Sequence, residues 1–188
     1  MSNFLDTAEI GYKNACLRCI DEQVKFNKKH VTYNKNGIID VRVEDSNEIF
    51  IALSEIIHWS VEIYDRLDKR FIDEEDKKIM SGVKHIDNIL KHTEQNFELW
   101  NFLRLYSKHE IKGSKKDGNL NLNYRIVLAF QFQYISSIPC EEKWQNQRQY
   151  YNDKIKEKDM NEVVSMIDKV LKEHFIDVRA RGGSVMLK

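Results

Sequence analysis

Hydrophobic side chains recur at helical spacing along most of this chain. One apolar stripe runs through residues 3–28, and a second, denser one runs from Glu48 to Leu67. Recurrence at positions i, i+3, i+4 and i+7 places side chains on one face of an α-helix. The same spacing predicts further helices, which begin at Asp73 or cover residues 97–110, 141–156 and 161–175. Because helical segments dominate, we predict a mainly α protein, a helical bundle of about five to six helices.

Two segments depart from this pattern. Over residues 120–134, apolar side chains occupy every second position, which is the period of a strand that buries one face. We therefore predict a short β element near these residues, and the length of the run allows a bend or a hairpin within it. A polar segment, Lys112–Gly118, separates it from the preceding predicted helix. Residues 30–44 contain Asn36 and Gly37 between β-branched residues, which fits either a hairpin or an irregular loop.

Composition and charge narrow the class of protein. The chain has 188 residues, 41% of them hydrophobic, with 7 Gly and 1 Pro, which fits one domain over residues 1–188 built from long helices. Within that domain we expect a C-terminal helical extension followed by a short tail. Thirty basic residues balance thirty acidic ones, so only a local basic patch could attract nucleic acid. The lack of a long apolar run and of a basic, apolar leader predicts a cytoplasmic protein without membrane contacts.

The three cysteines are Cys16, Cys19 and Cys140. The first two have the Cys-x-x-Cys spacing of metal and redox sites, but a tetrahedral zinc ion needs four ligands and no second pair accompanies them. Both also lie on the apolar stripe of residues 3–28. We therefore predict that they pack in the core, and that the protein has neither a metal site nor a cofactor.

A polar stripe accompanies the apolar pattern of the third predicted helix. His85, Asn88 and His92 are spaced i, i+3 and i+7, so they project from one side, with Lys84 and Lys91 beside them. An imidazole titrates near neutral pH and can take a proton from a ribose 2′-hydroxyl, while lysines or an amide stabilise charge on the phosphate. These residues are candidates for catalysis and phosphate binding without a metal. The alternative is the solvated side of a helix whose other face is buried.

This segment resembles a known family. Residues 82–92, preceded by a Trp-bearing apolar helix, are similar to HEPN-type proteins, small α-helical domains whose signature is commonly Arg-Asn-x-x-x-His. Asn88 and His92 match that signature, whereas Asp87 stands at the position of the arginine. The resemblance, clearest over residues 45–110, implies a domain that often dimerises so that two motifs form one cleft. It also implies a metal-independent endoribonuclease of the kind found in toxin–antitoxin or phage-defence systems.

Asp87 bears on what such a site could do. A carboxylate beside the scissile phosphate repels it, unless Lys84 or Lys91 takes the role of the missing arginine. The expected function is a HEPN-like RNA-binding protein or endoribonuclease of a bacterial defence or toxin–antitoxin module, with activity reduced or absent. The alternative is a non-enzymatic protein-interaction module, or a regulator or inhibitor encoded on a mobile element. A two-fold homodimer would bring a second His92 to the same cleft, so the expected partners are a second copy and either RNA or a protein.

Two further groups of residues extend the candidate site. Basic side chains recur every four residues and then cluster, which suits phosphate binding without base specificity, at Arg104, Lys108, Lys112, Lys115 and Lys116. A solvated face near a helix C-terminus would show the same pattern. Polar side chains also follow one side of the second predicted helix, at Glu55, His58, Glu62 and Asp65. We expect these four to line a pocket that faces His92 and to bind no metal, because a matching second Glu-x-x-His pair is missing.

Overall fold

A computed structural model describes residues 4–30, 46–92, 99–116, 119–133 and 142–180. These residues form five α-helices, three short 3-10 helices and one two-stranded antiparallel sheet. The α-helices are α1 (Phe4–His30), α2 (Asn47–Arg66), α3 (Glu74–His92), α4 (Gln145–Lys154) and α5 (Met160–Ala180). The strands are β1 (Leu103–Lys116) and β2 (Asn119–Phe132), and the 3-10 helices are η2 (Lys69–Phe71), η3 (Leu99–Phe102) and η4 (Glu142–Trp144). The predicted mainly α fold with one short β element is confirmed.

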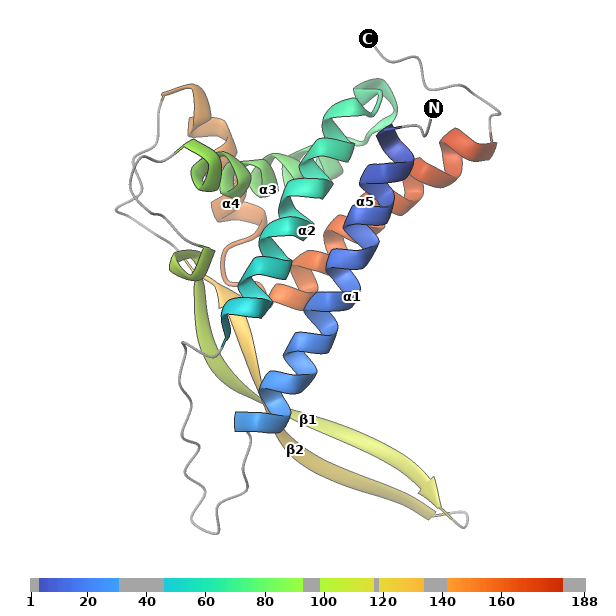
Figure 1. Cartoon of the computed structure of the whole chain (residues 1–188), viewed down its shortest axis with the longest axis vertical. Coiled ribbons are helices and arrows are strands. Elements are labelled where there is room, and N and C mark those ends of the chain that lie inside the picture. The colour runs from blue at the N-terminus through green and yellow to red at the C-terminus, as the bar shows by residue number, and fades with distance from the viewer. Residues whose placement is uncertain (1–3, 31–45, 93–98, 117–118, 134–141, 181–188) are drawn as a thin grey trace.

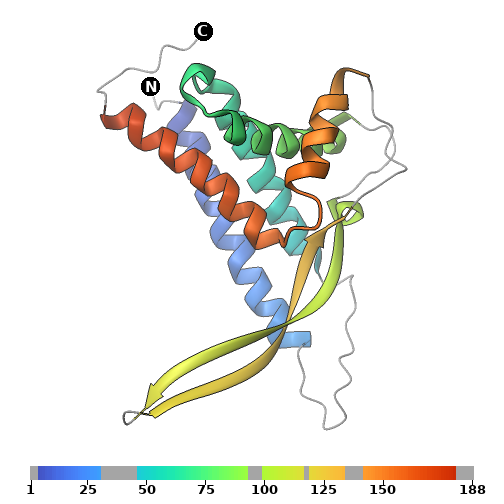
Figure 2. The same cartoon turned by 180° about the vertical axis from the view of Figure 1, so that it is seen from behind.

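The helical body is built around α2. Figures 1 and 2 show α1 and α2 running alongside each other, and α2 also packs against α3 and α5. Helix α2 is apolar on most of its circumference, and such a helix is stable only when it is surrounded. Its buried apolar residues therefore meet neighbours on several sides: Ile49, Phe50, Ala52, Leu53, Ile56, Ile57, Val61, Ile63 and Tyr64.

One core of buried apolar side chains unites the five α-helices with the base of the hairpin. Burying one large apolar side chain stabilises a fold by roughly 1.5–3 kcal/mol. The core draws on every α-helix and on β2, with members such as Ala8, Leu53, Ile86, Phe130, Tyr151 and Ile167. Cys19 belongs to it and Cys16 packs against it, which confirms that these thiols lie with the core side chains. None of the helices in the described ranges combines the length and the hydropathy of a bilayer-crossing segment.

Two glycines allow helices to approach each other closely. A Cβ atom at Gly11 of α1 would lie 2.6 Å from Cε2 of Trp59 in α2, so any side chain there would collide with the indole. A Cβ atom at Gly82 of α3 would lie 3.1 Å from the carbonyl oxygen of Tyr150 in α4. Because Gly82 has no side chain, α4 can lie directly on α3, and this contact decides the surroundings of the candidate site.

The prediction of a helix over residues 97–110 was wrong. This segment contains η3 and then the first half of β1, which pairs with β2 in register from Leu103 opposite Phe132 to Lys116 opposite Asn119. The polar segment Lys112–Gly118, predicted as a break, mostly continues β1. The apolar residues in this stretch fit both the helical period and the alternation of a strand. Pairing with β2 selects the strand, because the preference of a segment for strand structure depends on the neighbouring strand. The strand predicted over residues 120–134 is confirmed as β2, which begins one residue earlier and ends at Phe132.

The base of the hairpin is bound to the helices through the free edge of β2. The side-chain amide of Asn27 in α1 donates to the carbonyl oxygen of Leu128 at 3.0 Å and accepts from its backbone N–H at 2.8 Å. Further along the strand, Phe132 exchanges backbone hydrogen bonds with Glu157 and Lys158. The edge of β2 is therefore paired along its base, whereas the hairpin beyond it extends away from the helices (Figure 1).

The helix boundaries follow the sequence closely. Asp73 precedes α3, and its carboxylate accepts from the backbone N–H of Asp76 at 2.7 Å, as an N-cap residue does. Acidic residues fill the first turn of α3, where the helix dipole favours them. The predicted helix over residues 161–175 corresponds to α5, and that over residues 141–156 corresponds to η4 with α4. The hairpin or loop predicted for residues 30–44 lies outside the described residues, apart from His30 at the end of α1.

Candidate functional site between α2, α3 and α4

The polar residues predicted as one site occupy two different sides of α3. Lys84, Asp87 and Lys91 face acidic and imidazole groups of α2. His85 and Asn88 face α4. The third member of the predicted stripe, His92, is the last residue of α3, and its side chain lies outside the described residues. The fold therefore separates the two described members of the polar stripe, His85 and Asn88, from the lysines predicted to flank it.

A chain of charged groups joins α2 to α3. The carboxylate of Asp87 is buried, and it lies 2.7 Å from Nζ of Lys91 and 3.6 Å from Nδ1 of His58. Lys91 also lies 3.8 Å from Glu62, which accepts a hydrogen bond from Arg66 at 2.7 Å. This hydrogen bond is the main reason that the pKa of Glu62 lies below its usual range. Positive and negative groups alternate along the contact, so the charge of each lysine is offset locally.

The remaining α2 positions have different neighbours. Lys84 of α3 forms an ion pair with Asp65 at 2.5 Å, near the surface. Glu55, predicted to line the same pocket, instead pairs with Arg18 of α1. The expectation that four polar residues of α2 share one pocket therefore has to be corrected, because Glu55 points to another helix. The other three, His58, Glu62 and Asp65, contact α3 through its lysines and Asp87.

His85 is enclosed between α3 and α4. Only 2% of the residue is exposed, and its ring lies 5.7 Å from the ring of Tyr151. Burial lowers the pKa of His85 to about 4, and the positive charge of Arg148 lowers it further in the same direction. Nδ1 of His85 has no hydrogen-bond partner among the described residues. The imidazole is therefore neutral at physiological pH and is shielded from any substrate in solution.

Asn88 is also engaged by α4. Its side-chain N–H donates to Oε1 of Gln147 at 2.8 Å. The sequence contained no signal for this partner, because the polar run around Gln147 has no periodic apolar pattern that would orient it. Helix α4 thus covers the face of α3 on which catalysis was predicted.

The predicted basic patch lies on a strand and not on a helix. Arg104 and Lys108 occupy the same face of β1 because side chains alternate along a strand. Nε of Arg104 donates to Gln131 at 2.7 Å, and Nζ of Lys108 lies 3.0 Å from Asp159, which also accepts from the hydroxyl of Tyr106 at 2.6 Å. Arg104 therefore joins the two strands of the hairpin, because Gln131 lies opposite it on β2, and Lys108 fastens the hairpin to the residue just before α5. The side chains of the distal members, Lys112, Lys115 and Lys116, lie outside the described set.

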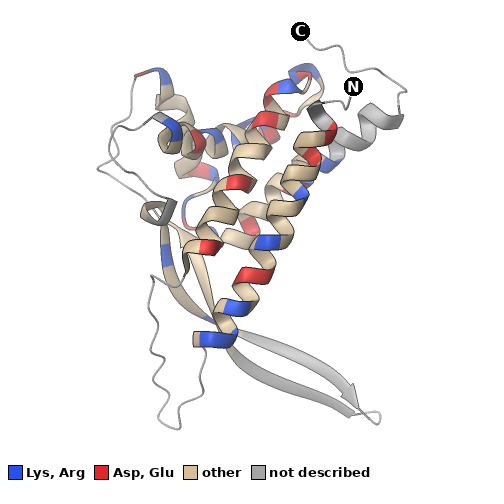
Figure 3. Cartoon of the chain, in the orientation of Figure 1, with Lys and Arg blue, Asp and Glu red and all other residues tan. Residues whose placement is uncertain are grey.

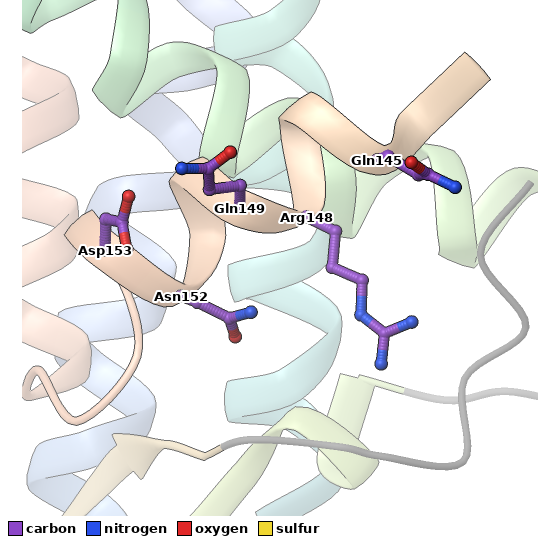
Figure 4. A pocket seen from close by; sticks show the side chains of 5 residues that line it. All are labelled: Gln145, Arg148, Gln149, Asn152 and Asp153. Carbon is purple, nitrogen blue, oxygen red and sulfur yellow. The ribbon is translucent and has the colours of Figure 1, made fainter. Parts of the chain in front are cut away.

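A shallow hollow of about 370 Å³ lies along the outer side of α4 (Figure 4). Figure 4 shows Arg148 and Asn152 extending from the same side of the helix. The hollow is lined by polar residues that all belong to α4: Gln145, Arg148, Gln149, Asn152 and Asp153. Among the residues that the structure describes, no three His, Cys, Asp or Glu side chains gather as metal ligands would. The hollow offers amides, one guanidinium and one carboxylate, but none of the predicted site residues.

Comparisons with protein-family models, with curated proteins and with solved structures found no match.

Proposed function

We propose that this protein is a non-enzymatic interaction module, which acts through its outer surfaces and not through the polar residues of α3. The observation that carries the proposal is that the described members of the predicted site are held in contacts within the chain. Asn88 binds Gln147, Lys91 binds Asp87, and His85 is buried. A site for RNA cleavage needs groups that are held in place and yet open to the substrate.

The electrostatics of the α2–α3 contact support this proposal. A phosphate needs cations whose charge is not already offset, but the charges of Lys84 and Lys91 are matched by Asp65 and Asp87. The negative charge of Asp87 also stands where the HEPN signature has an arginine. A phosphate approaching α3 would therefore meet a surface without net positive charge.

A second candidate is an RNA-processing site, and the contact between His58 and Asp87 favours it. About 41% of the His58 side chain is exposed, and its Nδ1 lies 3.6 Å from the buried carboxylate, without a hydrogen bond to it. In many general acid–base sites a carboxylate orients the imidazole by a hydrogen bond, and a small approach of His58 and Asp87 would be needed to form that bond here. In this candidate, His58 and the motif residue His92 would be the two proton-transfer groups, whereas Asn88 stays bonded to Gln147 on the other side of α3.

RNA cleavage in the presence of a chelator separates the two candidates. We expect the wild type, His58→Ala and His92→Ala to leave a labelled RNA equally intact. His109→Ala is the matched control, because His109 is an exposed histidine of β1 that lies outside the candidate site. Cleavage by the wild type and by His109→Ala, together with its loss in His58→Ala or His92→Ala, would reject the interaction module and establish the second candidate.

A further inference from the structure

Exposed hydrophobic side chains concentrate on one helix. Among the described residues, six large hydrophobic side chains are exposed, and four of them belong to α1. Such residues are common singly, whereas a contiguous group marks a surface that binds something. The four, with their exposed fractions, are Ile10 (59%), Leu17 (63%), Ile20 (57%) and Val24 (46%).

The four residues form a continuous line. Together with Lys13 they are spaced alternately three and four residues apart, over about 21 Å of helix at a rise of 1.5 Å per residue. This is the spacing of the seam along which two helices pack side by side. We call this line the outer seam of α1: Ile10, Lys13, Leu17, Ile20 and Val24.

The outer seam lies opposite the face of α1 that packs in the core. The core-facing residues of α1 are spaced in the same way on the other side of the helix: Ala8, Tyr12, Ala15, Cys19 and Phe26. Helix α1 thus has two apolar stripes, and the fold of one chain buries only one of them. A helix with two such stripes is typical of a position between two packing partners.

The charges near the outer seam favour one orientation of a partner helix. Exposed Asp6 lies in the first turn of α1, and exposed Lys28 lies in the last turn. Figure 3 shows basic residues at the C-terminal end of α1, where Lys28 and Lys29 lie in the last turn. An antiparallel copy of α1 would bring each acidic end beside a basic end, whereas a parallel copy would bring like charges together. The charges at the two ends of the seam therefore match those of a second copy only when the two helices are antiparallel.

We propose that the outer seam of α1 is a self-association surface, on which a second copy of this chain packs its own α1 antiparallel, centred on Leu17. An isologous interface places each surface against its own copy. With Leu17 at the two-fold axis, Ile10 lies level with Val24 of the second copy, and Asp6 lies level with Lys28 of the second copy. Lys13, the one polar member of the seam, limits the alternative registers. The proposal rests on α1 alone and uses a different surface from the cleft on α3 implied by the HEPN resemblance.

Sedimentation velocity of the full chain tests the surface. We expect the wild type to form a dimer, and Leu17→Glu to weaken dimerisation by about a hundredfold or more, because two carboxylates would meet at the two-fold axis. Phe71→Glu is the matched control, because Phe71 is 59% exposed and belongs to η2 and not to the seam; this variant should stay dimeric. Circular dichroism should show that both variants remain folded, since both side chains are already mainly in water. A monomeric wild type, or a Leu17→Glu variant that still dimerises, would overturn the proposal.

Charge reversal tests the orientation. Asp6→Lys and Lys28→Asp should each weaken the dimer by roughly tenfold, because each variant faces a like charge on the second copy. The double variant should recover the wild-type association, since it restores opposite charges at both ends of the seam. Failure of the double variant to recover would rule out the antiparallel pairing. None of these results depends on RNA cleavage, so the self-association surface and the interaction module can fail separately.

Discussion

On α3, the charged and amide side chains of the candidate site have partners within the chain, whereas on α1 four large apolar side chains that would gain from burial are exposed to water. Asp87 of α3 is buried against Lys91, and His85 is enclosed by α4. Leu17 of α1 is 63% exposed. The sequence predicted a functional site on α3, because the chemistry of its polar residues is easy to recognise. The structure instead indicates a binding surface on α1, since apolar side chains that the fold of a single chain leaves exposed mark such a surface.

The largest expected effect is on α3, where the burial of His85 should make the stability of the protein depend on pH. The pKa of His85 is about 4 in the folded protein and 6.5 in the unfolded chain, so the unfolded state binds the proton first as the pH falls. The stability that comes from keeping His85 neutral is therefore complete above about pH 6.5. As the pH falls from 6.5 to 4, the free energy of unfolding should decrease by about 3 kcal/mol. Urea unfolding at several pH values should show this loss in the wild type and a much smaller one in His85→Leu. If His109→Gln reduced the loss as much as His85→Leu, the enclosure of His85 would not be its cause.

A smaller effect is expected from the buried carboxylate of α3. Lys91→Met removes the cation beside Asp87, whose side chain is only 5% exposed, and should lower the free energy of unfolding by about 2 kcal/mol. Lys84→Met is the control on the same helix, because its partner Asp65 is 43% exposed; this variant should cost less than about 1 kcal/mol. Chemical denaturation at neutral pH measures both. Equal costs would mean that the burial of Asp87 adds nothing to the pair.

The hydrogen bond between α3 and α4 should contribute less again. A double-mutant cycle of Asn88→Ala and Gln147→Ala should give a coupling of about 1 kcal/mol in unfolding, as for a half-buried side-chain hydrogen bond. A structural role for Asn88 predicts this coupling and no change in the fate of RNA. If Asn88→Ala left the stability unchanged but abolished an RNA-cleaving activity, the assignment of α3 as a structural contact would be wrong.

The smallest expected effect is that of the outer seam of α1 on the stability of one chain. At low protein concentration, Leu17→Ser should change the free energy of unfolding by no more than about 0.5 kcal/mol, because the side chain is already exposed. At higher concentration the wild type should become more stable through mass action, and Leu17→Ser should not. Thermal melting over a range of protein concentrations measures the difference. A large cost at low concentration would show that Leu17 supports the fold itself.

Periodicity along the chain was sufficient to predict the five α-helices and the strand β2, because amphipathic stripes arise from local spacing alone. The same rule failed for residues 97–110, where the pairing of Leu103 with Phe132 selects a strand. Spacing also placed Cys19 correctly with the core side chains.

The surroundings of the candidate residues were decided by the tertiary structure. Helical spacing correctly placed His85 and Asn88 on one side of α3, but only the packing of α4 at Gly82 made that side an enclosed contact. Likewise, the sequence determined that α1 carries apolar residues on two sides, and the fold decided which side is buried. The physical reason is that periodicity describes one helix at a time, whereas burial and charge pairing depend on which other helix lies against it.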